Sequence, residues 1–177
     1  MVHFEILLKN NLLLFCIGGF TFWGFLSIIP LLIFYEENIT MPKIKIYDTT
    51  LRDGSQAEGV SFSLEDKILI ARRLDEFGMD YVEGGFPQSN PKEASFFREM
   101  AAAPLKQAKL AAFGSTRRAD TKVGDDNGIR SLLESGAPAC TIVGKCWDLH
   151  VRDVLRCSYE DNLKLCADSV AYLVSKG

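Results

Sequence analysis

The sequence lacks the paired-cysteine spacing that is typical of zinc proteins and of small disulfide-stabilised domains. No two of its five cysteines are arranged as Cys-x-x-Cys, and their other spacings fit neither a zinc knuckle nor a disulfide scaffold. These cysteines are Cys16, Cys140, Cys146, Cys157 and Cys166. We interpret them as reduced, mostly buried thiols of a cytoplasmic protein.

Clustered positive charge is also lacking. The chain has 20 Lys and Arg against 23 Asp and Glu, a net charge of -3, and no basic patch stands out along it. This distribution argues against a nucleic-acid partner. Histidine is scarce, with His3 and His150 far apart in the sequence. No low-complexity tract or internal linker occurs, and 177 residues is a typical length for one domain.

Residues 1–40 differ in composition from the rest of the chain. No charged residue occurs from Asn10 to Tyr35, and as a helix this run would cross a bilayer core of about 30 Å. One interpretation is therefore a membrane anchor through residues 10–35, with the N-terminus in the cytoplasm. The interpretation that we favour is a wrongly assigned start, with initiation at Met41 just ahead of the first predicted strand.

From Ile44 onward, predicted strands and helices alternate. Capping-box spacing at Ser63 and Ser158, and Pro91 directly after Asn90, indicate helix starts. Strands are predicted at residues 44–47, 81–83, 110–113 and 140–143, and helices after Ser63, after Asn90, around residues 129–133 and after Ser158. This order predicts an α/β fold with a parallel sheet. Four βα units are half of a TIM (β/α)8 barrel, which needs eight.

An incomplete barrel has consequences for exposed apolar surface. We expect Ile46, Val82, Ala112 and Ile142 to face the barrel interior and to lose part of their packing there. Leu163, Ala167, Val170 and Val174 form one apolar stripe along the last predicted helix. Residues 41–177 alone are therefore expected to be inactive and to self-associate.

The segment from Tyr47 to Gln56 has the residue types of a catalytic loop. It joins a predicted strand to a tight turn at Gly54 and places Arg52 next to Asp53. A carboxylate there can bind a divalent metal, and a guanidinium can stabilise a developing oxyanion. The alternative is a local role, in which Asp53 only favours the turn before Gly54.

Further polar residues follow the other strands, where barrel enzymes carry their active sites. Glu83 ends the second strand; Ser115, Thr116, Arg117 and Arg118 follow the third, and Lys145, Trp147, Asp148 and His150 follow the fourth. Glu83 has a structural alternative as an ion-pair partner of Arg52. For Arg117 and His150, a role as an ordinary residue of a solvated loop is as open as a functional role. The joint placement after successive strands favours a functional role for the residues that follow the first strand and for Glu83.

These motifs resemble those of a known enzyme family. Tyr47–Gln56 resembles the opening motif of the DRE-TIM metallolyases, which include isopropylmalate, homocitrate and citramalate synthases and hydroxymethylglutaryl-CoA lyase. Segments 83–93, 112–118 and 144–151 resemble the citramalate synthase branch, and the likeness covers residues 43–177. The resemblance implies that residues 41–177 are the N-terminal half of a TIM-barrel acyltransferase domain.

The resemblance also implies a reaction and a set of roles. Acetyl-CoA would condense with an α-keto acid, expected to be pyruvate, to give citramalate for isoleucine biosynthesis; isopropylmalate or homocitrate synthesis is the alternative. Asp53 would bind a divalent metal, with Mg, Mn and Zn all open. Arg52 would stabilise the oxyanion, and Glu83 would hold the site in place as the second catalytic candidate. Gln56, Arg117 and His150 would contact substrate, and the full-length enzyme would be a homodimer.

One departure from the family pattern limits these expectations. The family takes two further metal ligands from a late His-x-His motif, and this sequence contains none. One carboxylate with water is a poor metal site. We therefore expect a chain that corresponds to the enzyme's first half, cut before the fifth strand, and inactive by itself. The competing hypothesis is a membrane-anchored, non-catalytic half-barrel that serves as an interaction module.

Overall fold

The computed structural model describes residues 44–177. Our expectations for residues 1–40, including the apolar run at 10–35 and the start at Met41, lie outside the described residues. Among the helices of residues 44–177, none combines the length and the apolar character that a membrane crossing requires.

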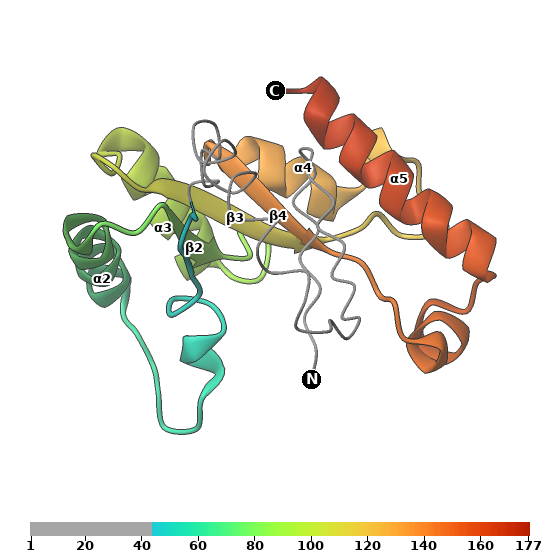
Figure 1. Cartoon of the computed structure of the whole chain (residues 1–177), viewed down its shortest axis with the longest axis horizontal. Coiled ribbons are helices and arrows are strands. Elements are labelled where there is room, and N and C mark those ends of the chain that lie inside the picture. Colours follow the sequence, from blue (N-terminus) through green and yellow to red (C-terminus); the bar gives the residue numbers. More distant parts are fainter. Residues whose placement is uncertain (1–43) are drawn as a thin grey trace, which may run out of the picture. The chain divides into compact units, whose positions relative to one another are not determined.

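Four parallel strands form one open sheet in the order β1-β2-β3-β4, with helices after the strands (Figure 1). The strands are β1 (Tyr47–Asp48), β2 (Tyr81–Gly85), β3 (Lys109–Ser115) and β4 (Ala139–Val143). The predicted α/β fold of four successive βα units is confirmed. Because all strands run in one direction, their C-terminal ends and the loops that follow lie at the same edge of the sheet.

The first strand begins later than predicted. We expected residues 44–47, whereas β1 begins at Tyr47 and leaves the Ile46 side chain 54% exposed. Ile46 still contacts the second strand, because its carbonyl accepts the N–H of Tyr81 at 3.0 Å. Its own N–H donates to the Asp80 carboxylate at 2.8 Å, so a side chain replaces the backbone acceptor of a regular ladder.

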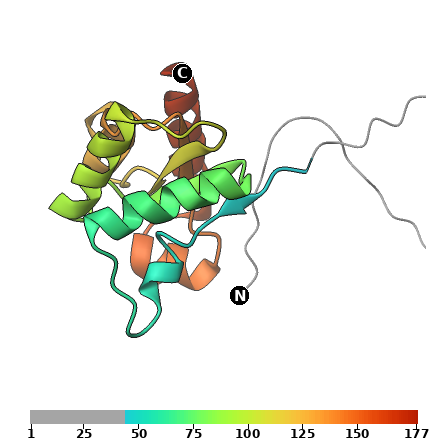
Figure 2. The ribbon, with the colours of Figure 1, turned by 90° about the vertical axis from the view of Figure 1, so that its left-hand side faces the viewer.

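Local capping signals set the starts of the first two helices. α2 (Leu64–Phe77) begins after Ser63, whose side chain accepts the N–H of Asp66 while the Asp66 carboxylate accepts the N–H of Ser63. α3 (Pro91–Ala102) begins after its predicted cap, Asn90. Both starts are confirmed, because each depends on residues within one helical turn. The two helices pack against each other on one face of the sheet (Figure 2).

The later helices combine one confirmed start with one that was missed. α5 (Tyr159–Ser175) begins after the predicted cap Ser158. α4 (Asn127–Glu134) is capped by Asp126, whose Oδ1 accepts the N–H of Ile129 at 3.0 Å. Three short helical turns were also missed, because they are too short to show a periodic pattern: η1 (Gly54–Gln56), η2 (Val123–Asp125) and η3 (His150–Leu155).

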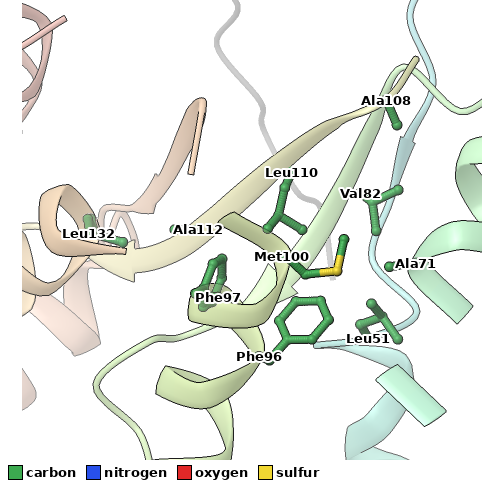
Figure 3. Close-up of a cluster of buried hydrophobic side chains, with 10 residues drawn as sticks. All are labelled: Leu51, Ala71, Val82, Phe96, Phe97, Met100, Ala108, Leu110, Ala112 and Leu132. Carbon is green, nitrogen blue, oxygen red and sulfur yellow. The ribbon is translucent and has the colours of Figure 1, made fainter. Parts of the chain in front are cut away.

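An apolar core lies between the helices and the outer face of the sheet (Figure 3). Its buried members are Leu51, Ala71, Val82, Phe96, Phe97, Met100, Ala108, Leu110, Ala112 and Leu132. α3 approaches β2 closely at Gly84, where an added Cβ would lie 2.7 Å from the ring of Phe96. A larger residue at position 84 would therefore displace α3 from the sheet.

The prediction that Val82 and Ala112 face the barrel interior is wrong. Both are 0% exposed and lie in the core under the helices (Figure 3). Side chains alternate along a strand, so the interior face belongs to the next residues, Glu83 and Phe113. The sequence pattern was read one residue out of phase, and the interior face is consequently more polar than expected.

A buried ion pair ties α2 and α3 to the end of β2. The Lys67 ammonium donates to both oxygens of Glu93 at 2.7 and 2.6 Å and to the carbonyl of Gly84 at 2.7 Å. Gly85 makes room for this pair, because a Cβ there would lie 2.2 Å from Glu93 Oε2, and its φ of 127° favours glycine. The pair fixes the backbone immediately after Glu83.

A second buried carboxylate closes the opposite end of the sheet. Asp75 at the end of α2 accepts the N–H groups of Lys106, Gln107 and Ala108 at 2.8, 2.8 and 2.7 Å. Burial by itself would raise the pKa of Asp75, but these backbone hydrogen bonds hold the pKa below its usual value. Asp75 therefore fixes the chain just before β3.

The predicted stripe on the last helix faces solvent in the described part of the chain. Leu163, Val170 and Val174 are 69%, 46% and 73% exposed. α5 instead packs through a mixed face that includes Leu165 and Ser169. The backbone carbonyl of Leu165 accepts the Ser169 hydroxyl at 2.6 Å, which allows this polar residue to be fully buried.

Replacing Lys67 by Met should lower the free energy of unfolding by about 3–5 kcal/mol, because the buried Glu93 carboxylate loses its partner. The double variant Lys67→Met/Glu93→Leu should recover most of this loss, since neither charge remains buried. Urea denaturation of the 177-residue chain measures both. Arg73→Met, in an ion pair whose side chains are 71% and 62% exposed, is the control and should change little. A double variant as unstable as Lys67→Met would contradict the account.

Asp75→Asn should lower the free energy of unfolding at pH 7 by about 1–3 kcal/mol, because the amide turns one donor toward backbone N–H groups. The Asp75 pKa is lower in the folded chain than in the unfolded chain, so its stabilisation is complete at neutral pH. It is lost as the pH falls below about 4 and through the folded pKa. Urea titrations at several pH values should show a flatter acid limb for Asp75→Asn than for the parent. Glu76→Gln, exposed on the same helix, should keep the parent's pH dependence.

Candidate active site

A tight turn after β1 holds Arg52 and Asp53 in place. The carbonyl of Thr49 accepts three backbone N–H groups, those of Arg52, Asp53 and Gly54, at 3.1, 2.8 and 3.2 Å. Leu51 is 1% exposed and anchors the turn in the core. The two functional candidates therefore project from a backbone that is fixed on both sides.

The structure brings Arg52, Asp53 and Glu83 together. The Arg52 Nε donates to Glu83 Oε1, and its Nη1 lies 3.3 Å from Asp53 Oδ1. The guanidinium carbon lies 4.1 Å from the centre of the Phe113 ring. The Nη2 group makes no hydrogen bond within residues 44–177, and the side chain is 22% exposed. Arg52 is thus held on three sides while one donor group stays available.

Glu83 is held from the opposite side by residues that the sequence did not reveal. Its side chain is 1% exposed, and its Oε2 accepts the hydroxyl of Tyr47 at 2.6 Å. The Tyr47 hydroxyl oxygen lies 2.7 Å from Thr141 Oγ1 on β4. Burial and the Glu83 carboxylate raise the pKa of Tyr47, which keeps its hydroxyl protonated. Alternation along β2 places Tyr81 on the same face as Glu83, but the register that pairs Tyr47 with Tyr81 is visible only in the structure.

The contact between Tyr47 and Thr141 also defines the curvature of the sheet. β1 and β4 are its two edge strands, separated by β2 and β3. Across a flat sheet, three strand spacings of about 4.8 Å would hold the backbones of β1 and β4 about 14 Å apart. The two hydroxyl groups can meet because the sheet coils around its interior face, as in a barrel.

The three residues predicted to contact substrate, Gln56, Arg117 and His150, lie in different surroundings. Gln56 is exposed at the end of η1, and His150 begins η3, its ring 4.8 Å from that of Trp147. η1 follows the edge strand β1 and η3 follows the other edge strand, β4, and both lie on the same side of the sheet (Figure 1). Arg117 is used within the fold: its guanidinium donates to Asp168 of α5 at 2.7 and 3.2 Å. These bonds hold the loop after β3 against α5.

A pocket of about 280 Å³ opens at the C-terminal ends of β2 and β3. It brings together Ser115, Thr116 and Arg118, which the sequence placed after the third strand, with Gln88 and the start of α4. Arg52, Asp53 and Glu83 do not line it. The chain therefore presents the Arg52 cluster on the interior face and a separate polar pocket at the ends of β2 and β3.

The described residues do not make a metal site by themselves. Within residues 44–177, no three His, Cys, Asp or Glu side chains lie close enough together to hold a metal ion. The Asp53 side chain is 55% exposed and one of its oxygens faces Arg52. One carboxylate with a cation beside it does not fit the donor set that a divalent metal needs.

Known proteins similar to this chain agree with the geometry. A family model described as HMGL-like matches residues 43–177. An (R)-citramalate synthase of Geobacter sulfurreducens is 53% identical over 133 residues, which are 75% of this chain and 25% of that enzyme. The (R)-citramalate synthase of Aquifex aeolicus is 56% identical over 131 residues, 74% of this chain and 25% of that enzyme. A probable 2-isopropylmalate synthase of Methanopyrus kandleri is 33% identical over 135 residues, 76% of this chain and 25% of that enzyme.

A solved structure supports the barrel-type fold. The crystal structure of Bacillus subtilis HMG-CoA lyase matches with a TM-score of 0.51 and 23% identity, over 70% of this chain and 40% of that chain. The chain spans about a quarter of the length of the curated relatives it matches. The resemblance to the DRE-TIM metallolyases and the prediction of a partial TIM barrel are confirmed. The chain belongs to the HMGL-like family.

Proposed function

We propose that this chain is the part of a citramalate synthase that carries the Asp-Arg-Glu cluster. The observation that carries the proposal is the Arg52 guanidinium, fixed by the buried Glu83 with its Nη2 group left available. Sequence similarity also supports citramalate synthesis, since relatives named (R)-citramalate synthase are 53% and 56% identical to this chain. Relatives named for homocitrate and isopropylmalate synthesis are 33% identical, which makes those reactions the weaker candidates.

The proposed chemistry of Arg52 is electrostatic. After a base removes a proton from the methyl group of acetyl-CoA, the resulting enolate carbon attacks the keto carbon of pyruvate, and the keto oxygen becomes an alkoxide that is then protonated. A guanidinium that is already oriented stabilises this charge without reorganising during the reaction. Glu83 does not face the substrate, because it is 1% exposed; its role is to position Arg52. Hydrolysis of the citramalyl thioester would then release CoA and citramalate.

Asp53 is proposed as one ligand of a divalent metal, whose identity as Mg, Mn or Zn stays open. Gln56 and His150 remain proposed substrate contacts. The bonds from Arg117 to Asp168 favour a positioning role for Arg117 in the loop after β3. Isoleucine biosynthesis, a cytoplasmic location and a homodimeric full-length enzyme are proposed on the family resemblance alone.

A chimaera tests the reaction. Residues 44–177 replace the matching segment of the Aquifex aeolicus enzyme, and citramalate formation from pyruvate and acetyl-CoA is measured with added divalent metal. We expect turnover with pyruvate to exceed turnover with 2-ketoisovalerate or 2-ketoglutarate. Arg52→Ala should lower kcat by about 10²–10³-fold while metal binding is retained, because its charge acts on the transition state. Asp53→Ala should lose bound metal and turnover together.

Arg73→Ala is the matched control, because this arginine lies on the exposed face of α2 in a surface ion pair. It should leave both kcat and metal content unchanged. A folded chimaera that prefers a larger keto acid would replace citramalate synthesis by one of the weaker candidates. Equal metal loss in Arg52→Ala and Asp53→Ala would refute their separate roles.

A further inference from the structure

Four side chains from β1, β2, β4 and the loop after β1 form one continuous chain of hydrogen bonds on the interior face of the sheet. The sequence of contacts is Thr141 to Tyr47 at 2.7 Å, Tyr47 to Glu83 at 2.6 Å, and Glu83 to Arg52. Glu83 and Thr141 lie on strands that are not neighbours in the sheet. Tyr47 is therefore the link that connects the β4 edge to the Arg52 site.

The direction of each hydrogen bond follows from the chemistry of the groups. An ionised carboxylate only accepts, so the single hydroxyl hydrogen of Tyr47 points to Glu83 Oε2. The Tyr47 oxygen then accepts the hydroxyl hydrogen of Thr141. Both Glu83 oxygens are occupied, one by Tyr47 and one by the Arg52 Nε. Each of the three contacts therefore has one donor and one acceptor, which fixes the direction of all three hydrogen bonds.

We propose that Tyr47, supported by Thr141, is a positioning residue that sets the orientation of the Arg52 guanidinium by holding the second oxygen of Glu83. The proposal rests on the proposed function only for its catalytic consequence; the orientation itself is a property of this chain. Tyr47 touches no reacting atom and acts through Glu83.

Removing the Tyr47 hydroxyl would leave Glu83 Oε2 buried without a donor. The carboxylate can recover a partner by turning both oxygens toward Arg52, in the two-pronged geometry that carboxylates and guanidinium groups favour. This turn would draw the guanidinium away from Asp53, now 3.3 Å from its Nη1, and off the Phe113 ring. The positive charge would stay in the site but in the wrong orientation.

The kinetic test uses the active chimaera described above. Tyr47→Phe should lower kcat by about ten- to a hundredfold, the equivalent of losing one hydrogen bond to a charged group. KM for pyruvate should change by less than about twofold, because the lost orientation matters in the transition state. Thr141→Val should reduce kcat in the same direction but less, and Thr141→Ser, which keeps the donor, should restore the parent value.

Tyr81→Phe is the control. This ring stacks on Tyr47 at 5.9 Å between centroids, and its hydroxyl makes no hydrogen bond within residues 44–177. The substitution removes the same atom from the neighbouring strand and should leave kcat unchanged. Equal losses of kcat for Tyr47→Phe and Tyr81→Phe, or a KM effect with kcat unchanged, would overturn the proposal.

A second readout needs no activity. In the 177-residue chain labelled with ¹⁵N-arginine, the Nη2 protons of Arg52, which gain a bond to Glu83 in the two-pronged geometry, should exchange with water at least about tenfold more slowly in Tyr47→Phe than in Tyr81→Phe. Slower exchange with an inactive chimaera would leave the positioning role supported and reject the proposed reaction. An active chimaera with identical exchange rates and identical kcat in the two variants would reject the positioning role and retain the reaction.

Discussion

The interior face of the sheet is organised around a single buried carboxylate, that of Glu83. It is 1% exposed, and a charge in that position is tolerated only when donors occupy its oxygens. Arg52 supplies one donor from the loop after β1, and Tyr47 supplies the other from β1 itself. The need to satisfy Glu83 therefore determines the conformation of Arg52, the group that we expect to meet the developing negative charge.

The rest of the fold supports this arrangement from the outer face. The Lys67–Glu93 pair holds the backbone at Gly84 and Gly85, directly after Glu83, and ties it to α2 and α3. Asp75 fixes the chain that leads into β3, the strand that carries Phe113 under the Arg52 guanidinium. A buried ion pair and a buried carboxylate thus position the strands, and the apolar core fills the space between the strands and helices.

Local features could be predicted from the sequence, and long-range ones could not. The capping residues Ser63, Asn90 and Ser158 act within one helical turn, so their patterns were sufficient. The interior face was misassigned because a phase error of one residue exchanges Val82 for Glu83. Tyr47 and Thr141 are 94 positions apart and meet only because the sheet coils, a property that no local pattern encodes. Arg117 and Asp168, 51 positions apart, illustrate the same limit.

The coiling of the sheet through Tyr47 and Thr141 is the central claim, and a double-mutant cycle tests it most directly. Unfolding free energies of the 177-residue chain are measured for Tyr47→Phe, Thr141→Val and the double variant. A hydrogen bond between the two edge strands predicts a coupling energy of about 0.5–3 kcal/mol, because either single substitution already breaks the contact. Losses that add to within about 0.3 kcal/mol would show that these side chains do not meet. The site would then lack the support that this structure assigns to it.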